Sequence, residues 1–196
     1  MSITTEKFEE IKTKYGHMSS WALWKDKDEQ GKEKSNMGDT SIFETSVDSL
    51  NPNVVFVGLN ISKKIIEPFG NFHPNYSTAH DYKIRYAVKD TLFQGAYMTD
   101  IIKDFEEKIS GNVIKYINQN KEFLKENIKS FEEELEFIGS NEPILIAFGN
   151  DCYKILNKHL KDKYKIFKVS HYSSSVTKEQ LKDQLNQILC TSSNSK

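Results

Sequence analysis

The chain has 196 residues, of which 27 are Lys or Arg and 28 are Asp or Glu, so its formal net charge is −1. This length suits one domain with a substantial core, because domains cluster near ~100–200 residues. The balanced charge excludes a global basic field for nucleic acid and a strongly acidic, disordered chain, so any polyanionic partner must bind a local patch. We expect a single domain over residues 1–190 and a flexible tail over 191–196.

The amino-terminal segment predicts a short amphipathic helix over residues 4–15. Phe8, Ile11 and Tyr15 recur there at helical spacing, and Gly16 follows as a C-cap. The first residues lack the cationic start and apolar stretch of a secretory leader, and no segment approaches the ~18 apolar residues of a membrane span. We therefore expect a cytoplasmic protein without a membrane partner.

Two tryptophans, Trp21 and Trp24, precede a charged, glycine-containing run over residues 25–39. The charge of this run predicts an exposed loop. The tryptophans are expected to pack the loop against the core, and a stacking role toward a ligand is the alternative.

Four apolar runs follow, over residues 54–60, 95–102, 143–150 and 164–173. Their apolar character is continuous, which indicates strands covered on both faces, as in a parallel sheet between layers of helices. Segments with apolar residues three and four apart separate them, so strands and helices alternate. We predict an α/β fold, a three-layer α/β/α arrangement with a central, mainly parallel four-stranded sheet. The expected helices span residues 77–91, 99–109, 112–138, 150–160 and 177–189.

Polar residues gather where the predicted strands end. In open α/β sheets, ligands bind beyond the carboxyl ends of the strands, where the connecting loops converge. A glycine followed by an amide also serves there simply to turn the chain, so one such tripeptide leaves both interpretations open. The residues at these ends are Gly58, Leu59, Asn60, Thr99, Asp100, Gly149, Asn150, Ser170, His171, Tyr172 and Ser173.

The order and spacing of these segments resemble the uracil-DNA glycosylase superfamily, most closely its mismatch-specific uracil and thymine glycosylase branch. The stretch VGLNIS is similar to the family's Gly-Ile/Leu-Asn motif and supplies Gly58, Leu59 and Asn60. The stretch PFGNFHPNY then offers Phe72, with Phe69 as second choice, for the aromatic residue that stacks on an extruded base. YMTDIIK, ILIAFGNDCYKIL and SHYSSS match the later motifs in outline, so the resemblance covers most of the chain.

Three positions depart from the family's pattern. Ile61 and Tyr172 stand where the family commonly has proline, and Asp100 stands where many members have asparagine. An ionised aspartate presents only acceptors, so it would repel O4 of uracil and favour a base with an exocyclic amine, as in cytosine derivatives or adenine. Burial that keeps the carboxyl protonated would restore a donor. Alternatively, Asp100 simply caps a helix that begins beside Thr99.

The resemblance implies a DNA glycosylase that hydrolyses the N-glycosidic bond of a flipped damaged, mismatched or modified base. Asn60 would position the attacking water, and His171 would donate a hydrogen bond to the departing base. Such an enzyme needs no cofactor. The resemblance assigns base contacts to Gly58, Leu59, Phe72, Phe69 and Asp100.

DNA, single- or double-stranded, is the partner that the resemblance implies. Serine hydroxyls and backbone amides hold phosphates without added charge, and few ion pairs predict a shallow salt dependence, about −0.9 per phosphate contact. The same serines are equally explained as the start of a helix capped by Ser175 or Thr177. The expected DNA contacts are Ser62, Lys63, Lys64, Lys83, Arg85, Tyr172, Ser173, Ser174 and Ser175, with Lys178 as a further candidate.

The balanced charge and the three departures leave a second class of function open. A catalytically silent member of the same fold would bind nucleic acid, a nucleotide or a protein partner. The cysteines Cys152 and Cys190 have neither CxxC spacing nor nearby histidines, so we expect no metal site and no metal cluster.

Overall fold

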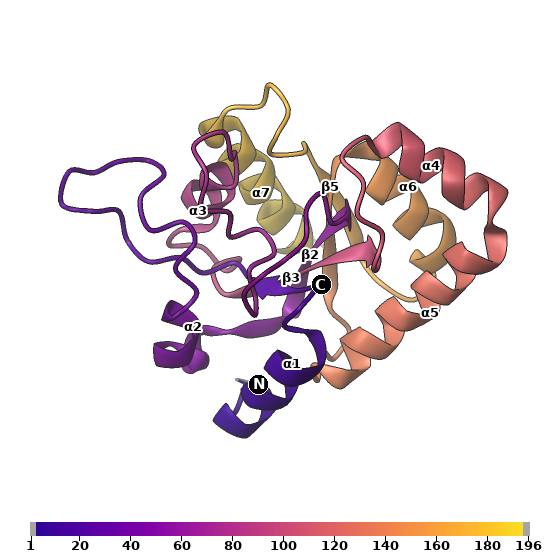
Figure 1. Cartoon of the computed structure of the whole chain (residues 1–196), viewed down its shortest axis with the longest axis horizontal. Helices are drawn as coiled ribbons and strands as arrows, with labels where there is room; N and C mark the ends of the chain where they lie inside the picture. The colour runs from indigo at the N-terminus through magenta and orange to yellow at the C-terminus, as the bar shows by residue number, and fades with distance from the viewer. Residues whose placement is uncertain (1–2, 194–196) are drawn as a thin grey trace.

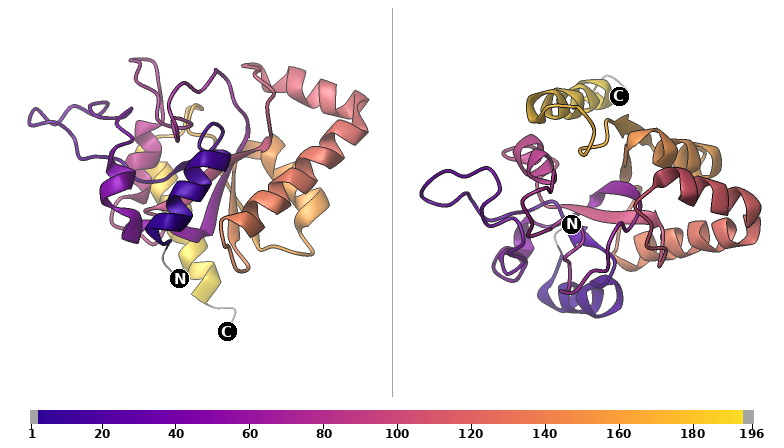
Figure 2. Two further views of the ribbon diagram at one scale, coloured as in Figure 1. Left: turned by 60° about the horizontal axis from the view of Figure 1, so that its bottom comes forward. Right: turned by 45° about the horizontal axis from the view of Figure 1, so that its top comes forward.

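The computed structural model describes the backbone of residues 3–193 and the side chains of residues 3–190. A central sheet carries helices on both faces, which confirms the α/β class (Figure 1). Figure 2 shows the first and last helices on opposite sides of this sheet. The elements are α1 (Thr5–Tyr15), β1 (Ser20–Trp21), α2 (Ile42–Thr45), the 3-10 helix η1 (Val47–Ser49), β2 (Asn51–Asn60), α3 (Tyr82–Val88), β3 (Ala96–Ile102), α4 (Ser110–Gln119), α5 (Lys121–Phe137), β4 (Ile144–Phe148), α6 (Gly149–Leu160), β5 (Ile166–Val169) and α7 (Lys178–Ser193).

The described sheet has the strand order β1-β3-β2-β4-β5. The four strands that the apolar runs predict, β2 to β5, are neighbours and run parallel. The sequence pattern does not predict β1, which pairs antiparallel with β3 and makes the sheet mixed. Trp21 of β1 lies opposite Tyr97, and their rings meet edge to face with centroids 4.8 Å apart. This buried aromatic contact secures a strand that is too short to show periodicity.

Successive residues of β2 point to opposite faces of the sheet and build two cores. Val55 and Val57 pack into the core under α1, α4, α5 and α6, which we call the α5 face. Val54 and Phe56 pack into the core under α3 and α7, which we call the α7 face. Both faces are therefore covered, as the continuous apolar runs predict.

Three helix predictions need correction. The helix predicted over 77–91 is limited to α3, and the one predicted over 112–138 breaks at Asn120, whose ψ of 74° is not helical, into α4 and α5. The helix predicted over 99–109 is wrong, because β3 continues through Asp100 to Ile102 in parallel pairing with β2. At the carboxyl end, α7 continues to Ser193 into the predicted tail, and residues 194–196 lie outside the described part.

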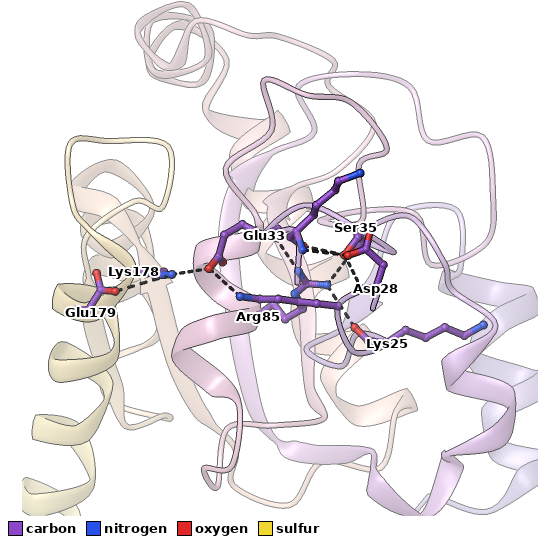
Figure 3. Close-up of polar contacts among 9 residues, drawn as sticks. Lys25, Asp28, Glu33, Ser35, Arg85, Lys178 and Glu179 are labelled. Atoms are coloured by element: carbon purple, nitrogen blue, oxygen red, sulfur yellow. Dashed lines mark hydrogen bonds and ion pairs between the residues drawn. The ribbon is translucent and has the colours of Figure 1, made fainter. Parts of the chain in front are cut away.

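The predicted packing of both tryptophans is confirmed. Trp21 and Trp24 are buried, and Trp24 stacks on His73 with ring centroids 4.6 Å apart. The charged run 25–39 that follows is the long indigo-violet loop in Figure 1. It is anchored rather than free, because Arg85 of α3 donates hydrogen bonds to its backbone carbonyls (Figure 3).

Candidate functional site

We call the region beyond the carboxyl ends of β2 and β4, where the strand order reverses direction, the crevice. The chain leaves β2 toward β3 on one side and leaves β4 toward β5 on the other. In open α/β sheets this topological switch point is the preferred ligand site. Gly58 and Asn60 lie at the end of β2, and Gly149 follows β4 directly.

Gly58 leaves room for an aromatic ring and a carboxyl group at the α7 face. It lies opposite Asp100 in the register of β2 and β3. A Cβ atom on Gly58 would collide with Asp100 Oδ1 and come within 3.2 Å of Phe72 Cζ. The absent side chain therefore lets Asp100 and Phe72 meet above the strand.

Asp100 is a buried carboxyl in the middle of β3, so the helix cap considered above is wrong. Asn71 Nδ2 donates a hydrogen bond to Asp100 Oδ2 at 2.8 Å. Burial raises the pKa of Asp100 to about 6, although the bond from Asn71 and the charge of Lys103 oppose this shift. Oδ1 accepts no hydrogen bond from any residue between 3 and 190.

Phe72 reaches this position through a strained backbone. Both Phe69 and Phe72 have positive φ, 60° and 62°, which is uncommon for bulky residues and costs of order 1–3 kcal/mol each. The Phe72 ring is 6% exposed and lies 6.2 Å from the rings of Phe148 and Tyr172. It is therefore at the crevice, but it fills the space above Gly58 instead of lining an open pocket.

His171 lies beside Gly149 and Tyr172. Its ring stacks on Tyr172 with centroids 4.5 Å apart, and its Cβ is 3.3 Å from where a Cβ of Gly149 would be. The backbone N–H of Ser173 donates to Nδ1 at 3.2 Å, so the proton of the neutral ring is on Nε2. Burial lowers the pKa of His171, which favours this neutral form. No residue of the described chain accepts a hydrogen bond from Nε2, so this donor is available.

Asn60 holds the loop that follows β3. Its Nδ2 donates to the backbone oxygens of Ile61, Phe105 and Glu107 at 2.8 to 2.9 Å. The side-chain oxygen accepts no hydrogen bond from the residues with described side chains, so it can bind a water molecule. Asn60 lies two residues beyond Gly58 on the same face of β2.

Two of the predicted base contacts lie away from the crevice. Leu59 points to the α5 face, where it is 8% exposed, so only its backbone reaches the crevice. Phe69 also packs into the α5 core, with its ring 5.4 Å from that of Phe8 and 5.7 Å from that of Phe43. The alternation of β2 and the strained loop thus leave Phe72 as the aromatic residue of the crevice.

Three of the predicted DNA-contacting cations are engaged with other groups of the protein, two of them buried and Lys178 at the surface. Lys83 is 7% exposed and donates to the backbone oxygens of Ser174 and Val176 at 3.1 and 2.8 Å. Arg85 is 8% exposed and bound to the loop 25–39. Lys178 forms an ion pair of 2.7 Å with Glu33 of that loop (Figure 3). These cations stabilise the fold and are not free for phosphates.

The remaining predicted contacts are exposed or form turns. Ser62, Lys63 and Lys64 are exposed in the segment after β2, and Lys63 Nζ lies 3.9 Å from the centre of the Tyr76 ring.

The three consecutive serines at positions 173–175, which we call the serine run, hold His171 in place. Ser173 Oγ is within 2.8 Å of His171 Nδ1, and the Ser174 N–H donates to the His171 backbone oxygen at 2.9 Å. Ser175 is exposed, and Thr177, not Ser175, caps α7 through a bond from the Gln180 N–H at 3.1 Å. An open polar depression adjoins the run and is lined by Ser170, Ser174, Ser175, Val176, Gln180, Asp183, Gln184 and Gln187.

Asp81, at the start of α3, is a member of the site that the sequence reasoning missed. It is 6% exposed, and its carboxyl group lies close enough to the Tyr172 hydroxyl to affect the pKa of that group. Burial raises the pKa of Asp81 to about 7. Its position within the aromatic-rich stretch NYSTAHDY is the only sequence signal that points to it.

The cysteines and the helices carry no further site. Cys152 is buried, and its thiol donates to the Val57 backbone oxygen at 3.3 Å, whereas Cys190 is exposed. Within the described residues, no three His, Cys, Asp or Glu side chains gather as metal ligands would. In the same part of the chain, no helix combines the length and apolar character required to cross a bilayer.

Together, the structure brings Gly58, Phe72, Asp100, His171 and Tyr172 into one crevice, with Asn60 further along the same strand. Comparisons with protein-family models, with curated proteins and with solved structures found no match to the chain.

Proposed function

We propose that the chain is a DNA glycosylase of the uracil-DNA glycosylase type, with the three-layer arrangement of that fold. The observation that carries this proposal is the meeting of Phe72 and Asp100 above Gly58 at the switch point of the sheet. An aromatic ring stacks on any flipped base, and a carboxyl group with a free oxygen reads its edge. A glycine at the strand end is what allows both groups to approach the same ligand.

The catalytic roles fall to Asn60 and His171. Hydrolysis of an N-glycosidic bond requires a positioned water at the sugar and a donor at the departing base. The free oxygen of Asn60 orients the water, while its Nδ2 is fixed by three backbone oxygens. The neutral His171 donates from Nε2 without carrying a full charge, which suits hydrogen bonding to a base oxygen more than proton transfer.

Few exposed groups are available to bind the DNA phosphates. Ser62, Lys63 and Lys64 are exposed beside the crevice, while Lys83, Arg85 and Lys178 are engaged elsewhere. We therefore expect weak, mildly salt-dependent binding, with a slope of about −0.9 per phosphate contact.

A catalytically silent binding protein is the second candidate. The 6% exposure of the Phe72 ring favours it, because the ring already packs against Phe148 and Tyr172 where a base would stack. For catalysis, the segment 61–81 that carries Phe72 has to move. Long segments without helix or strand are typical of such movable binding loops.

The test is to incubate the protein with single- and double-stranded oligonucleotides that carry a panel of damaged and modified bases, and then to heat in alkali to cleave abasic sites. We expect excision of at least one base, reduced about 10²-fold or more in His171→Gln. The exposed His159→Gln is the matched control and should retain full activity. Intact oligonucleotides throughout, with a correctly folded protein, would favour the silent candidate instead.

A further inference from the structure

Two buried carboxyl groups flank Tyr172 in the crevice. Asp81 and Asp100 both lie close enough to the Tyr172 hydroxyl to raise its pKa. Their side chains reach the crevice from different elements, Asp81 from the start of α3 and Asp100 from β3. Phe72 packs on Tyr172, so carboxyl groups and aromatic rings line the same space.

Three cations close to this pair are engaged with other groups. Lys83 and Arg85, on the same helix as Asp81, donate to backbone oxygens of the segments 174–176 and 25–35. Lys103 lies close enough to affect Asp100, but it is ion-paired with the buried Glu134. The crevice is therefore acidic although the whole chain is near neutrality.

One acceptor in this space has no partner. Asp100 is 4% exposed, its Oδ2 is bound by Asn71, and its Oδ1 lies above Gly58 near the edge of the Phe72 ring without a hydrogen bond from residues 3–190. A carboxyl oxygen without a protein donor can accept a hydrogen bond from a ligand. Oδ1 thus points to a ligand that carries an N–H donor or a positive charge.

We infer that the base removed by this protein is cationic and carries an exocyclic amine, as in an N-alkylated cytosine. This inference rests on the proposed function. A cationic base is attracted to carboxylates and to the faces of aromatic rings at once, and its amine supplies the donor that Oδ1 lacks. Uracil has neither a positive charge nor an amine.

The charge of such a base also fits the weak catalytic groups. Water oxygen bonds to C1′ of the sugar as the bond from C1′ to the base nitrogen breaks. The electron pair of that bond stays on the base and neutralises its positive charge, and one water proton passes to solvent. The base leaves as a neutral molecule, so the neutral His171 only holds its oxygen and does not need to stabilise an anion.

Binding is tested first, because it does not depend on catalysis. The affinities of 3-methylcytidine, cytidine and uridine for the whole protein are measured by calorimetry or thermal shift. We expect 3-methylcytidine to bind about tenfold or more tightly than uridine, and this preference to disappear in Asp81→Asn and Asp100→Asn. The exposed Asp162→Asn is the matched control and should keep it. Equal affinity for the three nucleosides would overturn the inference.

Excision then separates the two proposals. Single-stranded oligonucleotides with 3-methylcytosine or uracil are treated with wild type and with Asp100→Asn. Preferred removal of 3-methylcytosine by the wild type, reversed toward uracil in the variant, supports both proposals. Preferred removal of uracil by the wild type overturns the cationic substrate and leaves the glycosylase standing. Selective binding of 3-methylcytidine without excision of any base rejects the glycosylase, and with it the substrate, while the cation-binding crevice stands.

Discussion

Gly58 is the residue on which the geometry of the crevice depends. Its backbone has no unusual φ, so the requirement is for space and not for conformational freedom. The neighbours that occupy this space are Asp100 Oδ1 and Phe72 Cζ, both buried. A side chain at this position would therefore press on the two groups that are proposed to contact the base.

Gly58→Ala is expected to destabilise the protein by about 1–3 kcal/mol, because an added methyl in a packed site forces its neighbours to shift. Urea unfolding measures this change, and near-UV circular dichroism reports the displaced aromatic rings. Gly111→Ala in α4 is the matched control, since nothing lies within 4 Å of its Cβ position and alanine favours a helix by about 0.5–1 kcal/mol. A Gly58→Ala protein as stable as wild type, with an unchanged spectrum, would show that Asp100 and Phe72 move aside freely.

Helix α3 connects the crevice to the loop 25–39. Asp81 at its start faces Tyr172, and Arg85 one turn later donates to the backbone oxygens of Lys25, Glu33 and Ser35 at 2.6 to 3.3 Å. Figure 3 shows this guanidinium inside the loop. Arg85 is the only arginine of the chain, and its planar fork of donors suits several carbonyls at once in a way that lysine does not.

Arg85→Ala should lower the free energy of unfolding by about 2–4 kcal/mol, because it leaves three carbonyl groups without their charged donor. Limited trypsin digestion should then cut rapidly at the lysines of the loop 25–39. Lys89→Ala, at the residue that follows the same helix, is the matched control; its exposed ion pair with Asp26 is expected to contribute within about 0.5 kcal/mol. Slow cleavage and unchanged stability in Arg85→Ala would mean that the other contacts of the loop, such as the Lys178–Glu33 ion pair, hold it without Arg85.

The parallel strands were predictable because each buries both faces locally. Residues 54–57 and 144–148 show this in sequence without reference to any partner. Strand β1 was not predictable, since its formation depends on the contact of Trp21 with Tyr97 across the sheet. The wrong helix over 99–109 has a similar cause: its apolar spacing fits a helix, but pairing of Asp100 and Ile102 with β2 prevails.

The candidate site was predictable to a lesser extent. Strand ends locate Asn60 and His171 once a parallel sheet is assumed, whereas Asp100 lies within β3 opposite Gly58. Which side chains bind other groups of the protein, and so are not available to a ligand, depends on contacts between distant segments. The hydrogen bonds from Lys83 to the backbone oxygens of residues 174 and 176 illustrate this. The role of Asp81 likewise depends on the approach of Tyr172 from a distant part of the chain. The periodicity of the sequence carries no information about this contact.

The buried titratable groups make the stability of the whole molecule depend on pH in two opposite ways. Asp81 and Asp100 have raised pKa values, about 7 and about 6, because burial disfavours their charged forms. Their contribution to stability is complete below the unfolded pKa near 3.8 and is lost as pH rises through these folded values. Burial lowers the pKa of His73 to about 4, so its contribution is present above the unfolded value near 6.5 and is lost as pH falls toward about 4.

Asp81→Asn isolates one of these contributions, because asparagine cannot ionise but keeps an acceptor oxygen beside the Tyr172 hydroxyl. With about 1.4 kcal/mol per pKa unit, the raised pKa corresponds to roughly 4 kcal/mol between the two protonation states. The stability of Asp81→Asn relative to wild type should therefore rise by about 2–4 kcal/mol between about pH 4 and about pH 8, as measured by urea unfolding. The effect of His73 is common to both proteins and cancels, and Asp162→Asn is the control at an exposed site. If the relative stability of Asp81→Asn does not change with pH, the Asp81 carboxyl ionises as freely in the folded protein as in the unfolded chain, and it is then no part of a closed acidic crevice.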